Sequence, residues 1–167
     1  MHNKKKYPSN AVINIFKISK FFYQFRLTKI FATLLYYLNR FIFNCVIPPK
    51  ANIHNTVHFG LNGFGNIINS LSKIDRDVYL GANVLIGGDA KNIGAPHIKK
   101  NCIIFSNATI LGPITIGENC VIAAGSIVLK DVPDNSLVAG IPSKIIKKNI
   151  DVDEYNPFKK KKIEKFT

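Results

Sequence analysis

The sequence predicts a parallel β-helix, a coil of short stacked strands, for the centre of its 167 residues. Branched aliphatic residues recur every six positions in two runs, and the fourth residue after each is mostly small or compact. A helical period of 3.6 does not fit this spacing, and an ordinary strand alternates every second residue without a longer repeat. One inward aliphatic residue per six is typical of a β-helix. The ten positions of this frame are Ile68, Ile74, Leu80, Ile86, Ile98, Ile104, Ile110, Ile116, Ile122 and Val128.

The segment before the coil predicts helix. Residues 11–44 are rich in Phe, Tyr, Ile and Leu with interspersed polar residues, which favours one or two amphipathic helices. We expect Pro48 and Pro49 to end them, because proline lacks the backbone donor and disfavours helix in the residue before it. Residues 1–10 are expected to be disordered.

Two interruptions of the period predict loops. Phe59 is followed by the next framed residue, Ile68, only after nine positions, and the slip falls in the glycine-rich run 60–65. The second interruption, residues 87–96, returns in phase at Ile98. A loop leaving a rigid scaffold is the natural place for a substrate site. An element that caps the C-terminal end is expected after Val128, because an open coil would expose unpaired strand edges.

Composition narrows the function classes. The three cysteines are an odd number and predict buried free thiols, with Cys102 and Cys120 stacked one coil apart, and no Cys or His cluster predicts a metal site. The net charge of +13 is concentrated at the two ends. These basic ends predict either solvated tails or attraction to phosphates or an anionic membrane surface. Nucleic acid is not expected, since no nucleic-acid-binding motif accompanies the basic residues.

No membrane span or secretion signal is predicted. The best candidate span, residues 30–47, is interrupted by Asn39 and Arg40. The lysines at positions 4–6 are not followed by a clean apolar run and a cleavage site. We therefore expect a cytoplasmic protein, with peripheral contact at the inner face of the membrane as an open possibility.

Motifs in the second half of the coil resemble those of a known family. Residues 110–136 read ILGPITIGENCVIAAGSIVLKDVPDNS and residues 139–144 read AGIPSK. Residues 34–40, LLYYLNR, and 47–53, IPPKANI, precede them. Over residues 30–148 the sequence resembles the hexapeptide-repeat acyltransferases, most closely the serine acetyltransferase-like branch.

The resemblance implies a left-handed parallel β-helix, a homotrimer, and acetyl-CoA bound in a groove between neighbouring coils. We divide the chain into a basic, aromatic helical segment (1–46), the β-helix acyltransferase domain (47–148) and a basic C-terminal tail (149–167). Residues matching the family's positions for acetyl-CoA are small or basic: Gly88, Ser106, Ala124, Gly125, Lys130 and Lys144.

The polar groups of the family's serine site are missing from the sequence. Transfer of an acetyl group to a hydroxyl needs a base, usually His, oriented by a carboxylate. A gapless match puts Val46 at the family's Asp position, Leu61 at its His position, and Gly60 at the adjoining Asp. Its Arg-His pair falls on residues 94–95, Gly and Ala. Moving His58 onto the family's His instead requires compensating gaps that break the inward phase of Ile53 and Phe59.

Two histidines remain as candidate catalytic bases. His97 stands where the second loop rejoins the coil, and His58 precedes the first loop. Asp89, in the second loop, is a candidate to orient one of them. We therefore expect an acetyl-CoA-dependent O-acetyltransferase whose acceptor is a hydroxyl of L-serine or of a sugar in surface polysaccharide synthesis. The alternative is a catalytically silent trimer that binds acetyl-CoA or scaffolds a partner.

Overall fold

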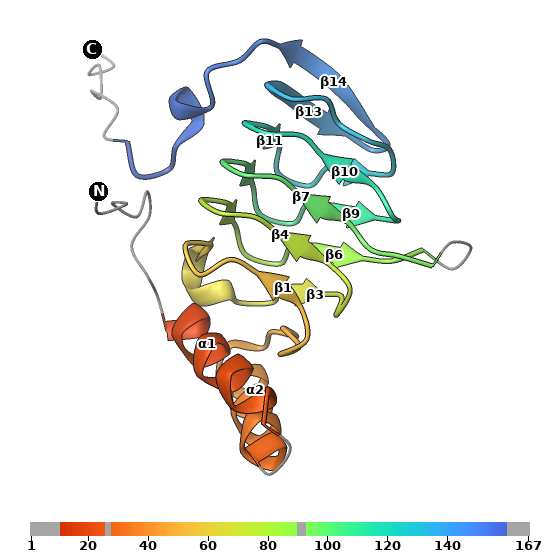
Figure 1. Ribbon diagram of the computed structural model, residues 1–167. Coiled ribbons are helices and arrows are strands. Elements are labelled where there is room, and N and C mark those ends of the chain that lie inside the picture. The colour runs from red at the N-terminus through yellow and green to blue at the C-terminus, as the bar shows by residue number, and fades with distance from the viewer. Residues whose placement is uncertain (1–10, 26–27, 90–92, 160–167) are drawn as a thin grey trace, which may run out of the picture.

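A coil of short strands stands on a helical hairpin (Figure 1). The computed structural model describes residues 11–25, 28–89 and 93–159. The expected disorder of residues 1–10 lies outside these ranges. Among the described residues, no helix combines the length and the apolar character that crossing a membrane requires.

The strands form three sheets, parallel except for the last strand, β14; the sheets are the three faces of the coil and follow one another along the chain. Face 1 comprises β1 (Asn52–Ile53), β4 (Lys73–Ile74), β7 (His97–Ile98) and β10 (Thr115–Ile116). Face 2 comprises β2 (His58–Phe59), β5 (Tyr79–Leu80), β8 (Ile103–Ile104), β11 (Val121–Ile122), β13 (Ser136–Gly140) and β14 (Ser143–Lys148). Face 3 comprises β3 (Ile67–Ile68), β6 (Leu85–Gly87), β9 (Thr109–Leu111) and β12 (Ile127–Val128).

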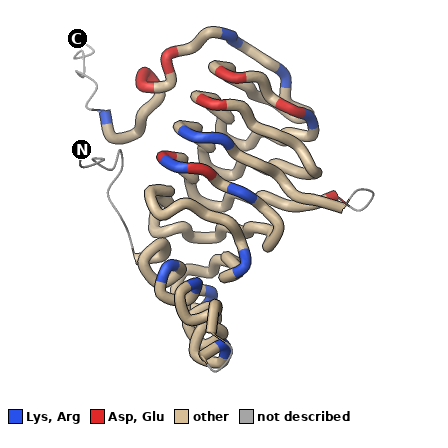
Figure 2. The backbone as a smooth tube through the Cα atoms, viewed as in Figure 1, with Lys and Arg blue, Asp and Glu red and all other residues tan. Residues whose placement is uncertain are grey.

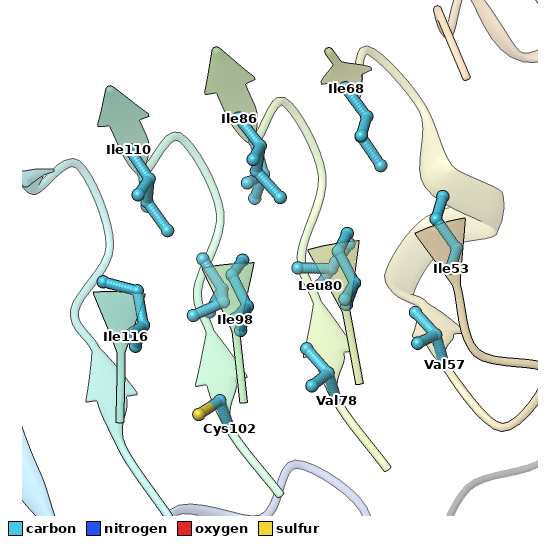
Figure 3. Close-up of a cluster of buried hydrophobic side chains, with 14 of the residues drawn as sticks. Ile53, Val57, Ile68, Val78, Leu80, Ile86, Ile98, Cys102, Ile110 and Ile116 are labelled. Atoms are coloured by element: carbon cyan, nitrogen blue, oxygen red, sulfur yellow. The ribbon is translucent and has the colours of Figure 1, made fainter. Parts of the chain in front are cut away.

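All ten residues of the six-residue frame point into the coil and are buried. The parallel register stacks equivalent residues of successive coils, so that Ile98 lies between Ile74 and Ile116 on face 1. Figure 3 shows these aliphatic columns and Cys102 at their margin. Burial of a branched side chain contributes about 1.5–3 kcal/mol, so one such residue per strand provides the core that two-residue strands need. The predicted β-helix is confirmed.

Asparagines make the turns between strands possible. Asn101, Asn119 and Asn135 all have positive φ, a conformation that Asn tolerates better than most residues. Their side chains also stack: the Asn101 amide donates to Asn119 Oδ1 at 2.7 Å, and Asn119 donates to Asn135 Oδ1 at 2.9 Å. The same residue therefore forms the turn and links it to the turn of the next coil.

The thiols occupy the same corner. Cys102 and Cys120 are buried, free and stacked one coil apart, as predicted. The Cys102 thiol donates to the carbonyl oxygen of Gly117 at 2.9 Å, and burial raises its pKa well above the usual range. Cys45, below the coil, is also free and buried, and burial raises its pKa to about 11.

The predicted N-terminal helices are α1 (Ala11–Tyr23) and α2 (Lys29–Phe43), packed as an antiparallel hairpin under the first coil. The Ser19 hydroxyl donates to the Ala32 carbonyl oxygen at 2.9 Å and ties the two helices together. Helix α2 ends within one residue of the predicted segment 11–44, but the prolines are not what ends it. It stops at Phe43 because Asn44 takes the left-handed conformation of a C-terminal cap, five residues before the second proline.

The C-terminal end of the coil is capped, as expected, by the antiparallel pairing of β14 with β13. The chain then descends along face 2 through the 3₁₀ helix η3 (Val152–Tyr155). Ile150 and Val152 pack on Ile103 and Val121, the outward side chains of β8 and β11. The described part of the predicted tail therefore covers face 2.

Candidate active site at the corner between faces 3 and 1

The second loop leaves the coil at the corner between faces 3 and 1, which we call the 3–1 corner. It departs after β6 at Gly88 and returns at β7, whereas residues 90–92 lie outside the described part of the chain. The base of the loop is tight: a Cβ atom on Gly88 would lie 2.8 Å from the Gly94 carbonyl oxygen. Gly94, with φ of 146°, packs in turn on Pro113 of the next coil. Glycine is required at both ends, which fixes where the loop starts and ends.

His97 is the first residue of β7 and projects outward from face 1. Its Nε2 atom lies 2.9 Å from Asp75 Oδ2, and both side chains are about one third exposed. An ionised carboxylate only accepts hydrogen bonds, so in the neutral imidazole this contact puts the proton on Nε2 and leaves a lone pair on Nδ1. The pair has the composition of a general base with its orienting carboxylate.

Asp75 is held in place from both sides. It directly follows β4, and its backbone N–H donates to the Ile98 carbonyl oxygen at 2.9 Å. Lys73 Nζ lies 3.5 Å from the other carboxylate oxygen, Oδ1. The backbone hydrogen bond to Ile98 and the side chains of Lys73 and His97 therefore hold the Asp75 carboxylate in place.

The sequence interpretation missed Asp75 and considered Asp89 instead. In the structure, Asp89 Oδ2 lies 3.5 Å from the place that a Cβ atom added to Gly112, on the next coil, would occupy. The carboxylate that contacts His97 is that of Asp75. The signal was present in the register. Lys73 and His97 are paired neighbours because the coil between them contains the usual 18 residues plus a six-residue insertion.

The other candidate base, His58, lies on face 2. It is buried and stacks on Tyr79 with ring centroids 5.7 Å apart, and Phe158 packs edge-on against it at 5.0 Å. Burial raises the pKa of the Tyr79 hydroxyl. This aromatic cluster fastens the C-terminal segment to face 2, and it lies on a different face from the second loop.

Three of the six predicted acetyl-CoA residues gather near the 3–1 corner. Register pairs Gly87 with Leu111 and Ile110 with Val128, so Gly88 and Lys130 lie two coils apart on one edge, roughly 10 Å. Lys130 and Lys144 line one cavity of 350 Å³ together with Leu129, Pro142 and Ser143. Two lysines in a partly apolar cavity can hold a phosphate-bearing ligand.

The other three residues lie at the opposite edge of face 3, the 2–3 corner. The Ser106 hydroxyl accepts from the Ala82 backbone N–H at 3.2 Å, and the Gly125 N–H donates to the Ser106 carbonyl oxygen at 3.0 Å. Ala124 is exposed there, and the space beside the Gly125 Cα is open. Within one chain, the width of face 3 separates them from the cavity of Lys130 and Lys144.

No polar side chain occupies the positions that match the family's serine site. Val46 forms a parallel bridge with Ile67, and Leu61 is 79% exposed with φ of 46°. Gly60 packs against the Tyr79 ring, which leaves no room for a side chain. Ile53 and Phe59 keep the inward phase that the gapless match requires, since both are buried. In the ranges that the structure describes, no cluster of His, Cys, Asp or Glu could hold a metal ion.

Comparison with known proteins supports the resemblance seen in the sequence. Residues 95–130 match the family described as bacterial transferase hexapeptide (six repeats). The chain carries the hexapeptide repeat of bacterial transferases. It is 38% identical to a serine acetyltransferase of Bacillus subtilis over 120 residues, which are 71% of this chain and 55% of that protein. It is 35% identical, with the same coverage, to a serine acetyltransferase of Bacillus pumilus.

Solved structures agree. A serine acetyltransferase of Brucella abortus superposes with a TM-score of 0.77 at 31% identity, covering 82% of this chain and 56% of that one. The same enzyme in complex with coenzyme A also gives a TM-score of 0.77, covering 83% and 55%. The resemblance to the serine acetyltransferase-like branch is therefore confirmed, although the chain spans about half the length of these relatives.

Proposed function

We propose that the protein is an acetyl-CoA-dependent O-acetyltransferase. The His97–Asp75 pair beside the second loop carries this proposal, because it offers an oriented base at the corner where Lys130 and Lys144 form a basic cavity. The similarity to serine acetyltransferases, one of them solved with coenzyme A, supports it. These similarities do not favour the alternative of a catalytically silent scaffold.

The reaction follows from the pair. A hydroxyl of the acceptor approaches Nδ1 of His97, which takes its proton as the oxygen attacks the thioester carbonyl carbon. Asp75 stabilises the resulting imidazolium through the hydrogen bond to Nε2. When the tetrahedral intermediate collapses, the carbon–sulfur bond breaks, and the imidazolium returns the proton to the departing thiolate. The products are the acetyl ester and CoA.

The acceptor is a hydroxyl of L-serine or of a sugar in surface polysaccharide synthesis. Valine and leucine stand at the positions of the family's Asp and His, and neither can accept a proton or orient an imidazole. The outward residues of face 1 are polar: Asn52, Lys73, His97 and Thr115. Polar side chains beside the base suit an acceptor with several hydroxyl groups, which supports a sugar. We expect slow serine acetylation and faster transfer to a sugar.

The active form in this proposal is a homotrimer. The outward side chains of face 3 are mostly aliphatic: Ile67, Leu85, Thr109 and Ile127. Three copies packed with face 3 toward a common axis would bury this row. The 3–1 corner of one copy would then meet the 2–3 corner of the next, which joins Lys130 and Lys144 to Ala124 and Gly125 of a neighbour.

The cytoplasm suits this chemistry. Three free, buried cysteines fit a reducing compartment, where disulfides rarely persist. Acetyl-CoA enters the proposal as a co-substrate consumed in each turnover, and the proposed site needs no metal ion.

The test combines three measurements on the full chain. CoA release is followed with L-serine and with a panel of sugars, light scattering gives the mass, and a thermal melt is recorded with acetyl-CoA. At 100 times Kd, a ligand that binds only the folded state adds about 2.7 kcal/mol, or roughly 5–10 °C in Tm. A shift without turnover on any acceptor would favour the silent trimer. No shift at millimolar acetyl-CoA would overturn the acetyltransferase, and a stable monomer at micromolar concentration would remove the shared site.

A further inference from the structure

The helical hairpin presents an apolar stripe that nothing in the described chain covers. Helix α2 contacts α1 through Ala32 and Asn39, both buried. Its opposite side carries large apolar side chains at helical spacing, and their exposed fractions run from 43% to 90%. We call this set the α2 stripe: Ile30, Leu34, Tyr37, Leu38, Phe41 and Ile42.

The hairpin holds this stripe rigidly at one end of the molecule. Asn39 Nδ2 donates to the Val12 carbonyl oxygen at 3.4 Å, which links α2 to α1. Val12 and Phe16 of α1 belong to the same buried cluster as Phe59 of the first coil. The stripe therefore faces outward on an anchored element, at the end of the coil opposite the C-terminal hairpin (Figure 1).

The charge around the stripe has one sign. The first 74 residues contain no Asp or Glu, and Asp75 is the first acidic residue of the chain. The described hairpin carries Lys17, Lys20, Lys29 and Arg40, and in Figure 2 its charged positions are all blue. Lysines at positions 4–6 precede it in the sequence.

Basic and aromatic groups are also interleaved. Lys29 Nζ lies 5.6 Å from the Tyr23 ring centroid, and Lys20 Nζ lies 5.8 Å from that of Phe16. Arg40 lines a cavity of 420 Å³ with Tyr37, Phe41 and Asn44. An exposed helix that combines apolar and aromatic residues with Lys and Arg is typical of elements that lie in a membrane interface.

We propose that the α2 stripe docks on the surface of an anionic lipid bilayer. A span is excluded by length, since the 15 residues of α2 reach about 22 Å, less than the roughly 30 Å of bilayer hydrocarbon. A second hairpin is a poor occupant, because two acid-free basic surfaces would repel each other. An anionic lipid surface satisfies both the apolar side chains and the uniform positive charge. The proposal goes beyond the acetyl transfer and does not depend on it.

Sedimentation with vesicles tests this proposal on the full chain. We expect binding to phosphatidylcholine vesicles that contain about one third phosphatidylglycerol, little binding to phosphatidylcholine alone, and loss of binding at high salt. Neutralising a basic residue near such a surface loses about 1 kcal/mol, or about fivefold. The double variant Lys29→Gln/Arg40→Gln should bind roughly 25-fold more weakly. The double variant Lys147→Gln/Lys148→Gln on exposed β14 is the matched control and should bind like the parent.

A second pair of variants tests the apolar contact. Phe41→Ser should weaken vesicle binding at least tenfold, whereas Ile146→Ser, at another exposed apolar position on β14, should leave binding unchanged. Both positions are surface-exposed, so we expect both variants to fold. A melting curve close to that of the parent checks this. Equal binding to neutral and anionic vesicles, or none to either, would overturn the proposal. A smaller mass of Phe41→Ser in light scattering, with vesicle binding unchanged, would assign the stripe to a second copy instead.

Discussion

The His97–Asp75 pair predicts that two separate substitutions abolish the same step. His97→Ala removes the base. Asp75→Asn keeps the size of the side chain but offers an amide, whose N–H₂ group can donate to Nε2 and so favour the imidazole with its proton on Nδ1. That imidazole cannot take a proton from the acceptor at Nδ1. Loss of general-base catalysis costs roughly 10²- to 10⁴-fold, and we expect kcat to fall by this factor in both variants.

The stability cost of the same substitutions is small. The pair is about one third exposed on each side, and even as an ion pair, with His97 protonated, such a contact contributes only about 0.2–1 kcal/mol to folding. In a chain of 167 residues, 1 kcal/mol shifts Tm by about 2–4 °C. The backbone bond from Asp75 to Ile98 does not involve the substituted atoms. A Tm that changes by only a few degrees, together with a fall in kcat of a hundredfold or more, would show that the substitution affects catalysis and not folding.

The assay is CoA release with the best acceptor found, recorded as a function of pH. Asp77→Asn is the matched control: Asp77 lies two residues away with φ of 57°, a conformation that Asn also adopts. We expect Asp77→Asn to keep parental kcat, as should His58→Ala on face 2. Parental kcat in His97→Ala would refute the assignment of the base. Parental kcat in Asp75→Asn alone would show that His97 works without its orienting carboxylate.

The remaining predictions concern ligand binding, the buried thiol and the turns. The double variant Lys130→Ala/Lys144→Ala should reduce the increase in Tm caused by acetyl-CoA at least by half, as should a bulky residue in place of Ala124. An undiminished increase in both variants would show that acetyl-CoA does not bind at the edges of face 3. Because burial raises the pKa of the Cys45 thiol to about 11, this thiol ionises in the unfolded state at lower pH than in the folded state, so the free energy of unfolding should fall by roughly 2 kcal/mol between pH 9 and pH 11. Urea titrations of the parent and Cys45→Ala check this, and an equal pH dependence would contradict it. Asn119→Ala should lower the free energy of unfolding by about 2–3 kcal/mol through left-handed strain and lost hydrogen bonds, and Asn119→Gly by about 1–2 kcal/mol. Equal losses in the two variants would show that the lost side-chain hydrogen bonds, and not left-handed strain, account for the cost.

The interior of the coil could be predicted from the sequence because its cause is local. Each six-residue unit buries one aliphatic residue, so the period alone identifies Ile98, Ile104 and the other inward positions. The stacking of Cys102 over Cys120 follows from the same count. The length of a coil and the phase of its inward residues need no knowledge of distant contacts.

The features that the sequence did not reveal depend on distant contacts. Asp75 meets His97 only because the inserted loop restores the register, and Asp89, which is closer in sequence, faces Gly112. Val152 packs on the apolar outward residues of β8 and β11. No local sequence pattern indicates which segment covers these residues. Helix α2 ends because Asn44 adopts the left-handed conformation, before the chain reaches the prolines at positions 48 and 49.

The three faces explain how such a chain can keep a fold and change its chemistry. The inward residue of each unit is aliphatic and belongs to the core, while the residue before it points outward and takes no part in the interior of the coil. On face 1 these outward residues are polar, on face 2 they are covered by the C-terminal segment, and on face 3 they are mostly aliphatic. A histidine placed at the outward position of β7 gains a carboxylate from the neighbouring coil without disturbing a single core residue. A base can therefore stand at a different corner of a β-helix at little cost in stability, and in our proposal the acceptor differs with it while the groove for acetyl-CoA is kept.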